Sequence, residues 1–197
     1  MKRYQANFTK GSLMIPESRI IAKLLLTHPT VDEWNEAVVE KNVLQKRTVN
    51  TASTLAGLIR GRLQTMHEDL WSLVASSSQE TIRQVLLAAT VKYSPLLGDF
   101  MLTVMKDLCR NFDERLSPLS WEKYLEDLWC QDSSTPRWTD TTVVKLRQTG
   151  FRILVEAGFL SDTKSLKLRK VFLTHEVRLC LLDHQEDYAL SCLQVCS

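Results

Sequence analysis

The chain has 197 residues, of which 44% are hydrophobic and 24% are charged, and its formal net charge is +2. This composition is that of an ordinary globular protein and excludes a disordered chain, while the length allows one large domain or two small ones. Because the total charge is close to zero, net charge alone indicates no class of partner, and only the distribution of charge can do so.

The cysteines and the N-terminus indicate the cellular compartment. Five cysteines without paired spacing argue against a secreted disulfide scaffold. The start Met1-Lys-Arg-Tyr4 lacks the apolar segment of a signal peptide, and no apolar run is long enough to cross a bilayer. We therefore expect a cytoplasmic protein that does not associate with a membrane.

The chain begins with a predicted arm and then two predicted helices. Residues 1–15 are expected to form an extended arm, and residues 16–115 an N-terminal helical half. Pro16 suits a first helical position, and the apolar stripe that follows it predicts a helix that ends near His28. Residues Val31–Glu40 predict a second, shorter helix.

A basic stretch follows this second helix. No acidic residue occurs between Lys41 and His67, and Thr48 is suited to cap a helix that runs to Met66. A helix, a basic connection and a second helix with short polar side chains at its start are the order of a helix-turn-helix. In that motif Lys and Arg hold phosphates and the second helix meets base edges. The candidate DNA-binding residues here are Lys41, Lys46, Arg47, Asn50, Thr51, Thr54, Arg60 and Arg62.

The alternative interpretation of this stretch is an ordinary helical hairpin with a solvated basic turn. The turn is longer than the three or four residues that are usual for the motif. On this stretch alone, the residues favour the ordinary hairpin.

The middle of the chain predicts the core. Ser77 and Glu80 have the spacing of a capping box, and the helix that they begin is expected to reach Tyr93. The next helix starts at Pro95, and its apolar residues, as far as Phe112, cover more than half of its circumference. We expect it to be the central buried helix.

The C-terminal half, residues 116–197, repeats the order of helices seen in the first. An acidic helix from Pro118 to Trp129 precedes a helix at 140–157, and Leu166–Leu173 alternates apolar and basic residues as in a short ribbon. This order is that of a winged helix-turn-helix, and the alternative is a solvated helix face with a surface hairpin. A final helix is expected at Thr174–Asp183, with the last dozen residues fraying. The candidate DNA-binding residues of this half are Arg137, Lys145, Gln148, Arg152, Lys164, Lys167, Arg169 and Lys170.

Catalytic and metal sites are not indicated by residue spacing. None of the four histidines has a spacing to cysteine or aspartate that makes a recognisable metal site, and there is no GxxxxGK[ST] phosphate loop. Cys192 and Cys196 are four residues apart, which is a weak metal signal, and unpaired thiols are the commoner outcome. We therefore expect no cofactor, no metal and no enzymatic activity.

Five blocks of the sequence resemble the BrxA family, the small core component of BREX bacteriophage-exclusion systems. They are Phe8-Thr-Lys-Gly11, Pro16-Glu-Ser-Arg19, Asn42-Val-Leu-Gln-Lys-Arg47, Leu58-Ile-Arg-Gly-Arg-Leu63 and Leu96-Leu-Gly-Asp-Phe100. The pattern of Trp138, the helix Val143–Gly158 and the basic ribbon is similar as well, so the resemblance extends over nearly the whole chain. The block Asn42–Arg47 is its most specific part.

The resemblance implies a compact all-α fold with two helix-turn-helix motifs, at most a short basic ribbon near 166–173, and positive surface beside the motifs. It also implies binding of double-stranded DNA in a system that methylates host DNA and blocks phage replication, and it implies no catalytic residues. A distant likeness to the antitermination protein NusB leaves RNA as an alternative ligand. The other alternative is an adaptor that holds further BREX proteins, such as the methyltransferase. Without a heptad seam, a monomer is expected.

Overall fold

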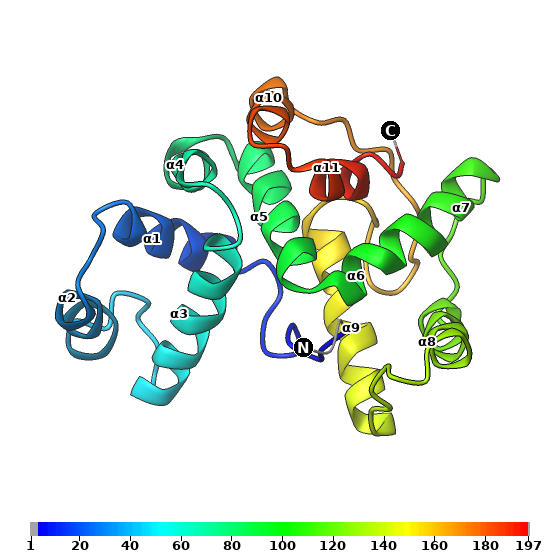
Figure 1. Cartoon of the computed structure of the whole chain (residues 1–197), viewed down its shortest axis with the longest axis horizontal. Coiled ribbons are helices and arrows are strands. Elements are labelled where there is room, and N and C mark those ends of the chain that lie inside the picture. Colours follow the sequence, from blue (N-terminus) through cyan, green and yellow to red (C-terminus); the bar gives the residue numbers. More distant parts are fainter. Residues whose placement is uncertain (1–3, 197) are drawn as a thin grey trace.

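The computed structural model describes residues 4–196 (Figure 1), so residues 1–3 of the predicted arm and Ser197 lie outside the described residues. Between residues 4 and 196 the fold is all-helical, as predicted, and β-structure is limited to two isolated bridges.

The helices that the structure describes are, in chain order, α1 (Ile15–Leu25), α2 (Val31–Asn35) with a π-helical continuation (Glu36–Glu40), α3 (Val49–Leu63), α4 (Glu68–Ser76), α5 (Gln79–Tyr93), α6 (Pro95–Phe100), a π-helical segment (Met101–Met105), α7 (Lys106–Arg110), α8 (Ser120–Gln131), α9 (Asp140–Glu156), α10 (His175–Asp183) and α11 (Asp187–Leu193).

Two helix starts test the capping predictions. Thr48 is the N-cap of α3, and its hydroxyl accepts a hydrogen bond from the backbone N–H three residues later, as predicted. At α5 the N-cap is Ser78, which accepts from the backbone N–H of Thr81. The predicted N-cap is therefore wrong by one residue, and the predicted capping box of Ser77 and Glu80 does not form, since Thr81 stands three positions after the N-cap.

Helix α5 lies at the centre of the molecule (Figure 1), and α1, α3, α4, α6, α10 and α11 all contact it. At Pro95 the chain turns by 107° into the helix that runs to Arg110, because proline can start a helix but cannot continue one. In the described part of the chain, no single helix is long and apolar enough to span a membrane. This bent pair meets that condition only when its two arms are counted together.

Aromatic side chains from both predicted halves meet in one core. Phe100 of α6 packs against Trp121 and Tyr124 of α8, with ring centroids 4.9 and 5.4 Å apart. Phe8 of the arm meets Trp121 edge-on at 6.1 Å, and Phe151 of α9 lies 6.3 Å from Phe100. Large buried rings contribute strongly to hydrophobic stabilisation, so the arm, α6, α8 and α9 depend on one another.

The helix from Pro95 was predicted to be the central buried helix, but α5 holds that position, and the last turns of the Pro95 helix (α7) contain no buried residue. Met101 and Met105 are completely buried, whereas Phe112 is 88% exposed. The helix ends at Arg110, and Phe112 has a φ of +59°, so the chain has already left the helical register that would direct this ring inward.

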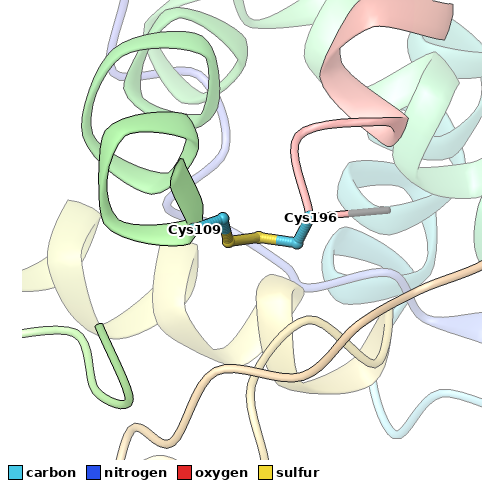
Figure 2. The surroundings of a disulfide bond; sticks show 2 residues. All are labelled: Cys109 and Cys196. Atoms are coloured by element: carbon cyan, nitrogen blue, oxygen red, sulfur yellow. A yellow bond between two sulfur atoms is a disulfide. The ribbon is translucent and has the colours of Figure 1, made fainter. Parts of the chain in front are cut away.

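The C-terminus does not fray as predicted. Residues Asp187–Leu193 form α11, which packs on α5, and Cys192 and Leu193 are buried. A disulfide joins Cys196 to Cys109 at the end of α7 (Figure 2). The prediction that unpaired thiols are the commoner outcome is therefore wrong for Cys196.

The ribbon predicted at 166–173 is reduced to two antiparallel bridges. Leu168 bridges to Leu160, and Lys167 bridges to Arg115. The segment after α9 thus folds back on itself across the turn 161–166, and its returning part lies beside the residues that precede α8.

Candidate nucleic-acid interface

The outward face of α9 carries the polar stripe that the sequence predicts. Lys145, Gln148 and Arg152 are exposed, while Leu146, Ile153 and Leu154 are completely buried. The helical period of 3.6 residues separates these two sets, so one face of α9 enters the core and the other is basic and open to solvent.

Two adjoining depressions extend this basic face. One is lined by Gln148 and Arg152 together with Thr163 and Lys164 from the turn after α9. The other is lined by Lys145, Gln148 and Arg152 together with Lys10 from the arm. Within the described residues, no acidic side chain lines either depression. We refer to Lys10, Lys145, Gln148, Arg152 and Lys164 as the α9 face.

The turn after α9 is held by its own hydrogen bonds. The carboxylate of Asp162 accepts from the backbone N–H of Lys164 and of Ser165 and from the hydroxyl of Ser165. These hydrogen bonds from Ser165 and Lys164 hold the pKa of Asp162 well below its usual range. The turn is therefore a defined element that presents Lys164 beside α9.

The arm is fixed from both sides. The backbone N–H of Leu13 donates to Oε2 of Glu156 at the end of α9, at 2.8 Å. From α3, the guanidinium of Arg62 donates to the carbonyls of Gly11 and Ser12. These contacts place Lys10 next to α9. The arm therefore connects α3 of the first predicted DNA-binding region to α9 of the second.

Arg62 therefore cannot hold a phosphate as the sequence suggested. Its side chain is only 4% exposed, and its donors bind backbone carbonyls. Burial lowers the pKa of Arg62 to about 10, while Tyr93 and Glu156 act in the opposite direction. Arg62 remains charged at neutral pH, and its role in this fold is to anchor the arm.

Most of the other cations between Lys41 and Arg62 form ion pairs or a cation–π contact with other side chains. Lys46 pairs with Glu17 at 2.6 Å, and Lys41 pairs with Glu36 at 2.9 Å. The guanidinium of Arg60 lies 4.6 Å from the centre of the Trp34 ring. Arg47, Asn50 and Thr51 are exposed, and Thr54 is half-buried, at the start of α3.

Asn42 explains why the block before α3 has a defined shape. Its side-chain amide donates to the carbonyl of Lys46 and accepts from the N–H of the same residue, at 2.8 and 3.0 Å. Asn42 and Gln45 both have positive φ angles, which asparagine tolerates better than most residues. The connection is a closed loop rather than a short helix-turn-helix turn, and the structure does not confirm that motif.

The other basic residues of the second half lie apart from the α9 face. Arg169 and Lys170 line a separate depression beside Cys109 and Cys196. Lys167 is exposed next to its bridge with Arg115, and the guanidinium of Arg137 lies 5.7 Å from the centre of the Trp129 ring. The structure thus brings Lys145, Gln148, Arg152 and Lys164 together. Neither depression of the α9 face is lined by Arg137, Lys167, Arg169 or Lys170.

Figure 1 shows that α3 and α9 lie on either side of the N-terminal arm, with their N-terminal ends at the same lower edge of the view. The N-terminal ends of these two helices therefore lie at one edge of the molecule, with the arm between the helices. Lys10 was missed by the sequence reasoning because an isolated lysine in an arm has no periodic pattern, although it lies within the block Phe8–Gly11.

Comparisons with known proteins agree with this fold. The BrxA family model matches residues 2–185. A "BREX protein BrxA" of Paramagnetospirillum magneticum is 42% identical over 98% of this chain and 97% of its own length. A second, from Escherichia coli O9:H4, is 33% identical over 91% of this chain and 84% of its own.

A solved structure extends the likeness to three dimensions. The crystal structure of an uncharacterized protein from Magnetospirillum magneticum superposes with a TM-score of 0.90 at 41% identity, covering 98% of this chain and 99% of that one. The match of the family model, the two relatives and the shared fold lead to one conclusion: the chain belongs to the BrxA family of BREX phage-defence systems.

Proposed function

We propose that this protein is a non-enzymatic, double-stranded DNA-binding component of its BREX system and that the α9 face is its principal contact. The supporting observation is the convergence of Lys10, Lys145, Arg152 and Lys164 from three separate segments, with no acidic side chain among the described residues that line the depressions. Convergent cations at this density suit a backbone of closely spaced phosphates.

The geometry around α9 supports a winged-helix mode of binding. In the chain, the short helix α8 is followed by a connection and by the longer helix α9, which has a polar outward face. A turn then folds back by the bridge Leu160–Leu168. In that mode Lys145, Gln148 and Arg152 face the major groove, and Lys164 contacts the sugar-phosphate backbone beside it.

The start of α3 supplies a second, weaker contact. Arg47, Asn50 and Thr51 are exposed there, but the ion pairs of Lys41 and Lys46 remove most of the free positive charge. With one bidentate-capable amide on each helix, Asn50 and Gln148, base recognition is limited, so we expect binding with little sequence preference.

A titration by fluorescence anisotropy tests this proposal. A labelled random duplex is titrated at several salt concentrations with the wild-type protein and with the triple variant Lys145→Ala, Arg152→Ala, Lys164→Ala. Each lost phosphate contact lowers the salt slope of log affinity by about 0.9, so the variant should lose roughly 1 unit of slope through Lys164 and most of its affinity through the loss of all three cations.

A charge-matched variant, Lys23→Ala, Lys106→Ala, Arg178→Ala, serves as the control because all three residues are exposed and line neither depression. It should bind like the wild type. Equal losses in both triple variants would reduce the interaction to non-specific charge attraction. Stronger competition by RNA or single-stranded DNA than by duplex would contradict the choice of ligand.

An adaptor role is the second candidate, and a specific surface favours it. Phe112 and Leu119, near the two ends of the segment that joins α7 to the acidic helix α8, are 88% and 69% exposed. Exposed large apolar side chains beside carboxylates are suited to a protein partner. Co-purification of another BREX protein that survives nuclease treatment, and that Phe112→Ser with Leu119→Ser abolishes, would support this role.

A further inference from the structure

Two histidines and one aspartate meet where α4 contacts α10, at the edge of the molecule opposite the N-terminal ends of α3 and α9 (Figure 1). His67 is the N-cap of α4, Asp69 lies in its first turn, and His184 directly follows α10. Nε2 of His184 lies 2.8 Å from Oδ2 of Asp69, and Nδ1 of His67 lies 3.2 Å from the same oxygen.

The spacing of these ligand atoms suits one metal ion. The three atoms lie within 4.8 Å of one another. Around a tetrahedral zinc ion with bonds of about 2.0–2.1 Å, neighbouring ligand atoms are about 3.3 Å apart. The separations of 3.2 and 2.8 Å are close to two edges of such a tetrahedron. The third separation, between the two imidazole nitrogens, is at most 4.8 Å and closes to the third edge when the rings rotate.

The cluster is held by weak contacts at His67. Nδ1 of His67 accepts a long hydrogen bond, 3.3 Å, from the backbone N–H of Asp69, and it lies 3.2 Å from the carboxylate of the same residue. Nδ1 has one lone pair, so a metal ion bound there replaces this long hydrogen bond.

The two imidazoles already lie side by side. The rings of His67 and His184 are stacked with 3.9 Å between their centroids. Each imidazole binds a metal ion with the lone pair in its ring plane, so binding of a shared ion turns the two rings out of this parallel stack.

We propose that His67, Asp69 and His184 bind a divalent transition-metal ion, with Zn²⁺ as the best match, and that this ion ties α4 to α10. Two imidazoles and one carboxylate form a ligand set that zinc accepts, whereas Ca²⁺ and Mg²⁺ require oxygen ligands throughout. Asp69 is 62% exposed and His67 49%, so the ion can enter from solvent and water can complete the coordination.

A metal ion at this position would act as a cross-link. Asp69 and His184 are 115 residues apart in the chain, and the cluster joins α4 to His184 by the 2.8 Å contact of Asp69 and by the stacking of His67. An ion that binds only the folded chain stabilises it in proportion to its occupancy. The inference does not depend on the proposed DNA binding.

Equilibrium dialysis and thermal unfolding test the proposal. The full-length protein is treated with a chelator, dialysed, and titrated with ZnSO₄ alone. We expect a single tight Zn²⁺ per chain and a higher Tm in its presence. His67→Ala and His184→Ala should weaken Zn²⁺ binding by more than about tenfold and abolish the rise in Tm.

Two variants provide controls. His28→Ala removes an exposed histidine that pairs with Glu68 at 3.6 Å, and Cys130→Ser removes an exposed free thiol that can itself bind zinc. Both should bind Zn²⁺ like the wild type, and circular dichroism checks that every variant is folded. The proposal is overturned if Zn²⁺ leaves the Tm of the wild type unchanged, if His67→Ala and His184→Ala bind as the wild type does, or if Cys130→Ser alone removes binding.

Discussion

At the scale of single residues, Arg62 is the side chain on which the arm depends. It donates to the carbonyls of Gly11 and Ser12 from a buried position. Arg62→Ala removes both bonds and leaves two acceptors without a donor, so we expect the free energy of unfolding to fall by about 2–4 kcal/mol. Urea denaturation measures this loss. The exposed Arg47→Ala should change it by less than about 0.5 kcal/mol, and equal effects of the two substitutions would contradict the anchoring role.

The same residue shows where sequence reasoning ends. Arg60 and Arg62 are two positions apart on α3 and look equivalent in the sequence, but about 200° of helical rotation separates their side chains. One lies over Trp34 and the other enters the interior beneath the arm. Which of the two is buried is decided by the position of residues 11–12, and local periodicity contains no information about that.

At the scale of elements, the contact between α6 and α11 depends on Gly98. A Cβ atom at this position would lie 2.9 Å from Cζ of Tyr188, whose hydroxyl donates to Asp99 at 2.8 Å. Because this hydrogen bond holds the ring in place, Gly98→Ala should displace α11 and lower the free energy of unfolding by about 1–3 kcal/mol.

Gly57→Ala is a matched comparison for Gly98→Ala, since a Cβ at Gly57 has nothing within 4 Å. There alanine should raise stability by up to about 1 kcal/mol through its better helix propensity. Urea denaturation of both variants checks the pair. A stabilising effect at both positions would show that α11 can move aside without cost.

Helices were predictable to the extent that their signals are local. The cap at Thr48 and the two faces of α9 follow from residue types at fixed spacing, and both are confirmed. The ribbon at 166–173 was only partly predictable. Alternation indicated extended chain, but the partners of Leu168 and Lys167 are Leu160 and Arg115, which the alternating stretch does not contain.

At the scale of the whole molecule, the features that sequence reasoning missed join distant segments. The cluster of His67, Asp69 and His184 and the pair Cys109–Cys196 each connect residues that are far apart in the chain. Neither has a recognisable spacing, because such contacts follow from the packing of α4, α10 and α11 around α5. The shared core also explains why the arm and the C-terminal half cannot be treated separately.

The disulfide is the last of these long-range links, and its contribution is measurable. Cys109 and Cys196 are 87 residues apart, so the bond closes a long loop in the unfolded chain and restricts its entropy (Figure 2). In the chain-entropy treatment this closure contributes about 4.6 kcal/mol as an upper value. Reduction with a phosphine should therefore lower the Tm of the wild type, while Cys109→Ser should start at the lower Tm and be insensitive to the reductant. Cys130→Ser keeps the bond and should respond like the wild type.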